Sequence, residues 1–156
     1  MRSIAGCSPG AAYKVARLRL ANVYGPRDTG RVIPIFIHNA LRGVPLTLYG
    51  GQQTIDFIWI GDAVRALLAA GFEDWPLDEA VNVGSGVGTP IRALAEGVLQ
   101  ATGSRIPIEV LPARSAEVVH FVAAVERLRA LLPSLNGREP LAHLPEVVDY
   151  WRGRAT

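Results

Sequence analysis

Apolar residues recur at helical spacing in five stretches of the chain, and short apolar runs bounded by glycine or proline lie between them. The helical spacing predicts helices at residues 31–41, 61–71, 90–101, 124–132 and 145–152. The short runs predict strands at residues 15–20, 46–49, 54–60, 80–83 and 106–111. This alternation of strands and helices is typical of an α/β fold.

The chain is organised around the stretch from Leu18 to Pro26. A strand predicted to be buried ends there, because Gly25 and Pro26 are turn residues and Pro26 cannot donate to a ladder. Asn22 and Tyr24 are thereby expected at the carboxyl end of a strand, where α/β sheets bind ligands. The alternative is a capped turn with a buried tyrosine.

Local signals refine some of the other elements. The pair Gly50-Gly51 between two β-rich runs predicts a hairpin of residues 46–49 and 54–60. Thr89 followed by Pro90 predicts the N-cap and first position of a helix. The run at residues 106–111 contains a proline, which favours an edge strand.

Composition narrows the classes of function. The formal net charge is +2 and the basic and acidic residues are interspersed, so no patch for nucleic acid is expected. No apolar run reaches the roughly 18 residues of a membrane span, and no signal-peptide core follows Met1. The lone Cys7 and three scattered histidines predict no metal site. We therefore expect a soluble cytoplasmic protein with neither a nucleic-acid nor a membrane partner.

Four motifs in order carry a resemblance to a known family. The segment Leu-Arg-Leu-Ala-Asn-Val-Tyr-Gly-Pro-Arg, the pair Asp56-Phe57, the turn Asn82–Gly86 and the segment that starts at Arg114 resemble the extended short-chain dehydrogenases, the NAD-dependent epimerase/dehydratase family that acts on nucleotide sugars. The resemblance spans about residues 14–152. It implies the last strands of a Rossmann-type sheet plus the small mixed α/β substrate-binding lobe. Residues 13–156 would be the C-terminal half of such a domain, after a flexible lead-in at residues 1–12.

The resemblance also implies roles for single residues. Asn22 would hydrogen-bond the sugar nucleotide, and Arg114 would hold its phosphates. Tyr24 and Pro26 would lie near the nicotinamide end of the cleft. The base would be flanked by residues of one helix and one strand: Val32, Ile33, Leu48 and Tyr49. For Asn22 a purely structural role as a turn cap stays open, and Tyr49 is equally expected as a core residue.

Three departures from the family pattern limit the functional hypothesis. Ile55 stands where the family has a phosphate-binding arginine, which places nucleotide diphosphate sugars in doubt. The sequence has no Tyr-x-x-x-Lys pair, since Tyr13 and Lys14 are adjacent. The glycine-rich turn that cradles the cofactor pyrophosphate is also not found. NAD or NADP is implied by the family, but we expect this chain alone not to bind it.

The favoured hypothesis is therefore a truncated epimerase/dehydratase-like protein that keeps the nucleotide-sugar-binding half and is inactive alone. The alternatives are a non-catalytic subunit that recognises a sugar nucleotide or completes a split enzyme, and a small fold unrelated to the family. A strand at residues 15–20 without neighbours on one side would be an association liability. We accordingly expect a homo-oligomer, a complementary N-terminal half as partner, or marginal stability.

Overall fold

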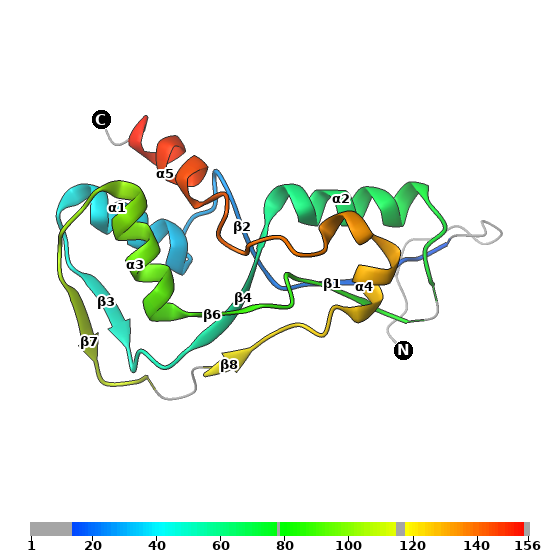
Figure 1. The fold of residues 1–156 in the computed structure, drawn as a ribbon, viewed down its shortest axis with the longest axis horizontal. Coiled ribbons are helices and arrows are strands. Elements are labelled where there is room, and N and C mark those ends of the chain that lie inside the picture. Colours follow the sequence, from blue (N-terminus) through cyan, green and yellow to red (C-terminus); the bar gives the residue numbers. More distant parts are fainter. Residues whose placement is uncertain (1–13, 78, 115–117, 155–156) are drawn as a thin grey trace, which may run out of the picture.

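A six-residue strand, β4 (Thr54–Trp59), runs through the middle of the molecule and joins two lobes (Figure 1). The computed structural model describes residues 14–77, 79–114 and 118–154, so the predicted lead-in at residues 1–12 lies outside the described residues. Strands and helices alternate along the chain, and most strand pairings among the described residues are parallel, which confirms the predicted α/β class.

The first lobe is a cluster of helices around one parallel strand pair, in the left half of Figure 1. Its elements are α1 (Val32–Arg42), α3 (Ile91–Thr102), α5 (Leu144–Arg152), β3 (Leu46–Tyr49) and β7 (Ile108–Leu111). Helix α1 forms because its apolar residues recur three and four positions apart and bury one stripe. Gly43 ends it in the left-handed conformation, at φ 71°.

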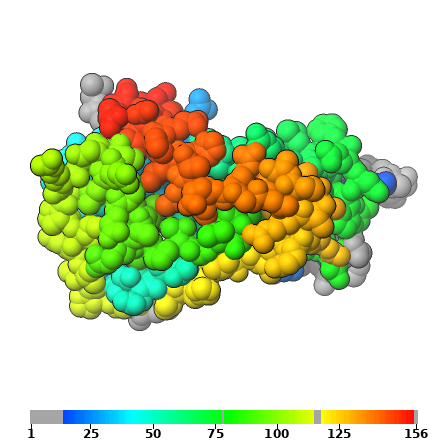
Figure 2. Space-filling view, viewed as in Figure 1, coloured from blue at the N-terminus to red at the C-terminus, as the bar shows by residue number. Residues whose placement is uncertain are grey.

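The second lobe surrounds the parallel pair of β1 (Leu18–Leu20) and β5 (Val81–Val83). Helix α2 (Ile60–Phe72) covers it on one side, and α4 (Glu126–Leu131) packs against β5. Its core is separate from that of the first lobe and contains Ile58, Trp75 and Leu128 among others. After α4 comes a short 3-10 turn, η1 (Pro133–Leu135). The chain then crosses the front of the molecule to α5, as the orange segment of Figure 2 shows.

Strand β4 pairs with elements of both halves of the sequence. It is parallel to β2 (Asn22–Tyr24) and β8 (His120–Phe121) and antiparallel to β6 (Gly88–Pro90). The predicted hairpin of β3 with β4 is wrong, because β3 pairs in parallel with β7 instead. Gly50 and Gly51 do adopt positive φ, but they direct the chain away from β3 rather than back along it.

Two further predictions about the N-terminal strand and α3 need correction. The strand predicted at residues 15–20 is only β1, and Leu20 is 46% exposed because β1 pairs on one edge alone among the described residues. Thr89 is not the cap of α3, since it lies buried in β6. The first free N–H of the helix, at Ile91, donates instead to the carbonyl of Gln53 at 2.8 Å.

Helix α2 faces the sheet with its small residues and the solvent with its large ones. Ala63, Ala66 and Ala69 are buried, whereas the outer face carries exposed large apolar side chains: Ile60, Val64, Leu67, Leu68 and Phe72. A solvent-facing helix side is normally polar. No described helix is both long and apolar enough to cross a membrane.

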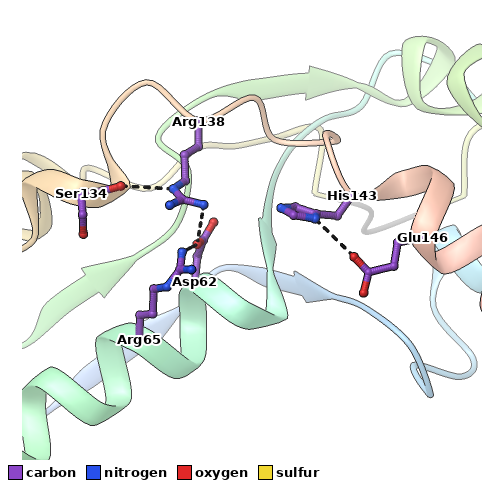
Figure 3. A network of polar contacts seen from close by, with 6 residues as sticks. All are labelled: Asp62, Arg65, Ser134, Arg138, His143 and Glu146. Atoms are coloured by element: carbon purple, nitrogen blue, oxygen red, sulfur yellow. Dashed lines mark hydrogen bonds and ion pairs between the residues drawn. The ribbon is translucent and has the colours of Figure 1, made fainter.

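A polar network fastens the start of α2 to the crossing segment (Figure 3). Asp62 accepts from Arg65 at 2.9 Å and lies 3.3 Å from Arg138. Arg138 in turn donates to the carbonyl of Ser134. The carboxylate is nearly buried, so these guanidinium partners offset the cost of removing it from water.

Candidate functional site

A cavity of about 510 Å³ lies in the first lobe. Its walls are one side of α1, the end of β3, the start of α3 and the residue Arg114 after β7. Val32, Phe36 and Asn39 line it together because they are spaced four and three positions apart on α1. Most of the lining is apolar, with hydrogen-bonding groups supplied by Asn39, Thr47 and Gln53. Such a mixture is typical of a small-molecule site.

Tyr49 and Arg114 form the charged end of this cavity. The guanidinium carbon of Arg114 lies 3.5 Å from the centroid of the Tyr49 ring, which is a cation–π contact. In β3 the side chains alternate, so that Leu46 and Leu48 are buried while Thr47 and Tyr49 are half-buried. This alternation places an aromatic ring and a cation side by side at one wall.

A second cavity, of about 280 Å³, adjoins the first. It is lined by Leu20, Ala21, Asn22 and Phe121, and it shares Ile55 and Val118 with the larger cavity. The side-chain amide of Asn22 donates to the carbonyl of Asp56 at 3.2 Å. Its amide oxygen accepts no hydrogen bond from the described residues, so it is available to a ligand in this cavity.

The residues singled out from the sequence fall into two groups. Val32, Leu48, Tyr49 and Arg114 line the larger cavity, and Asn22 lines the smaller one. The remaining three lie elsewhere: Ile33 is buried in the core of the first lobe, and neither Tyr24 nor Pro26 lines either cavity. Of the two neighbouring candidates on α1, Val32 is thus the one that borders open space.

Tyr24 is 1% exposed and packs edge-on against Trp59, with ring centroids 5.5 Å apart. Its hydroxyl is buried without a hydrogen-bond partner among the described residues. Burial raises the pKa of this hydroxyl to about 12, an effect that the nearby backbone of His143 partly offsets. Three carboxylates add to the rise in pKa: Asp62, Glu139 and Glu146.

A family model described as the NAD dependent epimerase/dehydratase family matches residues 8–84. The chain belongs to this family. The predicted resemblance is confirmed, and so is the predicted Rossmann-type relationship of the fold.

Individual members of the epimerase/dehydratase family show the extent of the likeness. A UDP-N-acetyl-alpha-D-glucosaminuronate decarboxylase of Bacillus cytotoxicus is 38% identical over 63% of this chain and 32% of its own length. A putative UDP-glucose 4-epimerase of Methanocaldococcus jannaschii is 32% identical over 74% of this chain and 39% of its own. The crystal structure of UDP-glucose 4-epimerase from Thermotoga maritima with UDP-glucose superposes with a TM-score of 0.75 at 30% identity. That match covers 89% of this chain and 46% of the epimerase. The chain thus spans less than half the length of these relatives.

The family name implies NAD, a dinucleotide whose pyrophosphate needs a binding site of its own. A pyrophosphate is usually held by free N–H groups of a glycine-rich turn after a strand. The turn Gly84–Gly86 follows β5, but the N–H groups of Ser85 and Gly86 donate to the carboxylate of Asp56 at 2.8 and 3.0 Å. A Cβ on Gly84 would meet the same carboxylate. This turn is therefore a structural clasp and does not fit a pyrophosphate.

Sequence reasoning missed several lining residues of the two cavities. Asn39 lies seven positions after Val32, a spacing that places both on one helix face and could have revealed it. Gln53, Val118 and Phe121 had no comparable signal. They come from a loop and from the region of β8, and only the parallel pairing of β8 with β4 brings Phe121 beside Ile55.

Proposed function

We propose that this chain recognises a nucleotide sugar in the two adjoining cavities. The observation that carries the proposal is their arrangement: an aromatic ring and a guanidinium lie at one end, Tyr49 and Arg114, and the amide of Asn22 lies at the other. An aromatic ring such as that of Tyr49 stacks on a base, and a guanidinium such as that of Arg114 pairs with a phosphate. An amide such as that of Asn22 can hydrogen-bond a sugar hydroxyl. The names of the family relatives, which act on UDP-sugars, support the same ligand class.

Each lining residue then has a stated role. Val32 and Leu48 flank the base, and Tyr49 supplies the ring wall. The guanidinium of Arg114 pairs with a phosphate of the ligand, and the side-chain amide of Asn22 hydrogen-bonds the sugar. Ile33 supports Val32 from the core. Tyr24 and Pro26 line neither cavity, and for them the proposal is a position near the nicotinamide end of a complete family site.

Hydride-transfer chemistry of this family needs a tyrosine activated by a lysine and a bound dinucleotide. The 156 residues include no Tyr-x-x-x-Lys pair, and Gly84–Gly86 is occupied by Asp56. We infer that this chain by itself binds its ligand without turnover and does not hold NAD.

The test is calorimetric titration of the chain with UDP-glucose, dTDP-glucose and NAD. Binding of a sugar nucleotide is expected, and Arg114→Ala should weaken it by about tenfold or more through loss of a charge-assisted hydrogen bond. Arg105→Ala is the matched control, because Arg105 is exposed and lines neither cavity. If no sugar nucleotide binds, the proposed recognition is wrong. Micromolar binding of NAD would contradict only the inference that this chain by itself does not hold NAD.

A second candidate function is that of a subunit completing an epimerase whose cofactor half is supplied by another polypeptide. Two features favour it. In the part of the chain that the structure describes, strand β1 pairs only with β5, whereas parallel sheets are normally extended and covered on both faces. The outer face of α2 also carries Leu67, Leu68 and Phe72 exposed. A strand beside β1, followed by a helix beside α2, would cover both.

Two observations separate the candidates. Genomic DNA that encodes a glycine-rich strand turn and a Tyr-x-x-x-Lys pair in frame upstream would favour one longer enzyme, and a separate neighbouring gene for that half would favour the subunit. Sedimentation velocity of the purified chain, alone and mixed with the product of such a gene, provides the physical test. A stable monomer that ignores the added half would exclude the subunit function.

A further inference from the structure

The carboxylate of Asp56 lies behind one wall of the smaller cavity. A Cβ placed on Gly84 would lie 2.6 Å from Oδ2 of Asp56 and 3.1 Å from the Cβ of Ala21, so the carboxylate and Ala21 border the same small volume. Ala21 lines the smaller cavity, and so does Ile55, which precedes Asp56 in β4. Asp56 itself is fully buried and lines neither cavity. It can therefore affect a ligand only through the residues that it holds.

Asp56 joins three segments that are far apart in the sequence. Its backbone carbonyl accepts from the side-chain amide of Asn22, at the start of β2, at 3.2 Å. Its carboxylate accepts from the N–H groups of Ser85 and Gly86, in the turn after β5, at 2.8 and 3.0 Å. The same carboxylate accepts from the N–H of Ala123, after β8, at 3.1 Å. Because hydrogen bonds to a charged acceptor are about twice as strong as neutral ones, the turn and the β8 segment are held firmly against β4.

Two of these segments supply the polar and the aromatic parts of the smaller cavity. Asn22 is the one hydrogen-bonding side chain among the described lining residues, and Phe121, two positions before Ala123, is the ring. The bond to Ala123 restrains the segment that carries Phe121, and the bond to the amide of Asn22 orients its oxygen. A binding group must be held to within about 0.5 Å of its productive position to be effective. Asp56 thus controls where Asn22 and Phe121 lie relative to each other.

We propose that Asp56 is a positioning residue for the contact between Asn22 and the sugar. This rests on the proposed recognition of a nucleotide sugar and adds to it a residue that does not touch the ligand. The pair Asp56-Phe57 and the turn Asn82–Gly86, which stand out in the sequence, then share one role. The turn supplies donors to the carboxylate, and the carboxylate keeps the wall of the smaller cavity in place beside Asn22.

The base and phosphate end of the site does not depend on this carboxylate in the same way. The walls of the larger cavity include α1, the end of β3 and Arg114. The donors to Asp56 named above belong instead to the turn after β5 and the segment after β8. A defect at Asp56 should accordingly affect the sugar end of a ligand and leave the end at Tyr49 and Arg114 unchanged. A general loss of structure would weaken both ends.

The experiment measures the contribution of the sugar to affinity. UDP and UDP-glucose are titrated calorimetrically into the wild-type chain and into Asp56→Asn, at a temperature at which circular dichroism shows each protein to be folded. The ratio of the two dissociation constants reports the sugar end, and the affinity for UDP reports the larger cavity. UDP-glucose should bind the wild type about fivefold more tightly than UDP, since one hydrogen bond to Asn22 forms. Asp56→Asn should reduce this ratio by about threefold or more and change the affinity for UDP by less than about twofold.

Leu128→Ala is the matched control for lost stability. Leu128 is buried in the core of the second lobe and lines neither cavity, so its truncation weakens the fold without altering the site. The ratio for the two ligands should remain that of the wild type. Asn22→Ala combined with Asp56→Asn should lower the ratio no further than Asn22→Ala alone, because both substitutions act through the same contact.

Ser85→Ala tests the same link if Asp56→Asn fails to fold. The hydroxyl of Ser85 donates to the carboxylate at 2.6 Å, and its removal leaves the N–H donors of Ser85, Gly86 and Ala123 in place. The ratio should then fall by about twofold or more, with the affinity for UDP unchanged.

The outcomes distinguish this inference from the proposed function. If the ratio in folded Asp56→Asn or in Ser85→Ala equals that of the wild type, Asp56 is only structural and the inference is wrong. A matching fall of the ratio in Leu128→Ala contradicts it as well. Equal wild-type binding of UDP and UDP-glucose also overturns it, since Asn22 would then add nothing at the sugar, while recognition of the nucleotide stands. If UDP, UDP-glucose and dTDP-glucose all fail to bind, the proposed function is wrong and the inference falls with it.

Discussion

The carboxylate of Asp56 lies so close to the backbone of Gly84 that a Cβ added to Gly84 would stand 2.6 Å from Oδ2. Ala123 and Ala21 crowd the same point, with Cβ atoms at 2.9 and 3.1 Å from it. Gly84 is therefore required by contact, since its φ does not lie in the left-handed region. The strand β4, the turn after β5 and the segment after β8 all converge here.

Gly84→Ala should destabilise the chain by about 2 kcal/mol, because the new methyl group must displace a buried carboxylate and the side chains of Ala123 and Ala21. Chemical denaturation monitored by circular dichroism measures this. Gly71→Ala is the matched control, since nothing lies within 4 Å of a Cβ at that position and alanine favours a helix. Equal effects of the two substitutions would contradict the crowding seen at Gly84.

Asp56→Asn should cost about 2 to 4 kcal/mol, because the fully buried carboxylate accepts from several donors at once. Those donors are the N–H groups of Ser85, Gly86 and Ala123 and the hydroxyl of Ser85. The asparagine amide replaces one acceptor oxygen with an NH2 group, which would face some of these N–H and O–H donors and could not accept from them. Asp149→Asn, at a largely exposed carboxylate, should change the free energy of unfolding by less than about 0.5 kcal/mol. A small loss in the free energy of unfolding for Asp56→Asn would show that the turn Gly84–Gly86 is stable without the hydrogen bonds to the Asp56 carboxylate.

Tyr24→Phe should leave the stability at pH 8 unchanged or raise it by about 1 kcal/mol, because the buried hydroxyl has no described hydrogen-bond partner. At high pH the free energy of unfolding should depend on pH more steeply in the wild type than in Tyr24→Phe. The pKa of Tyr24 is raised from 10.0 to about 12 in the fold, so the folded state keeps a proton that the unfolded state loses.

The sign of the Tyr24 effect follows from that difference in proton binding. Its contribution is fully present below pH 10 and is lost as the pH rises from 10 to about 12, at about 1.4 kcal/mol per pH unit. The free energy of unfolding of the wild type should therefore fall more steeply over this range than that of Tyr24→Phe. Parallel curves would mean that Tyr24 titrates near its ordinary value.

Leu67→Lys combined with Leu68→Lys should suppress any association of the chain while changing the stability of the monomer by less than about 1 kcal/mol. Both side chains are about half exposed on the outer face of α2, so lysine meets no steric obstacle there. Sedimentation velocity measures the change in association. The control is Ala93→Lys, which adds a charge to the exposed side of α3. Unchanged association in the double variant would exclude α2 as the contact surface.

Much of the helical structure follows from the sequence, because it depends on neighbours along the chain. The apolar spacing of Ile33, Phe36 and Ile37 and the glycine at Gly43 specify α1 locally. The strand pairing does not follow. A Gly-Gly pair between β3 and β4 favours a hairpin, yet β3 gains more by packing against α1 and α3 and by pairing with the distant β7.

The candidate site divides in the same way. Asn22, Tyr49 and Arg114 stood out as residue types in motifs, and they line the two cavities. The contact of Arg114 with the Tyr49 ring depends on β7 lying beside β3, some sixty residues apart, and no local pattern indicates it. Ile33 is buried in the core whereas its neighbour Val32 borders the cavity, and this difference depends on how α1 is rotated about its axis against its neighbours. Helical spacing alone does not decide which of two adjacent residues faces the core.

Neighbouring residues of β4 serve different cores, because Phe57 belongs to that of the first lobe and Ile58 to that of the second. A pleated strand directs successive side chains to opposite faces, so each lobe supplies the wall against which the other packs. If one lobe unfolded, the face of β4 that it covers would become exposed to solvent, and the other lobe would lose the strand against which it packs. Two cores that share one strand should therefore melt in a single transition, and neither lobe should persist after proteolysis within β4.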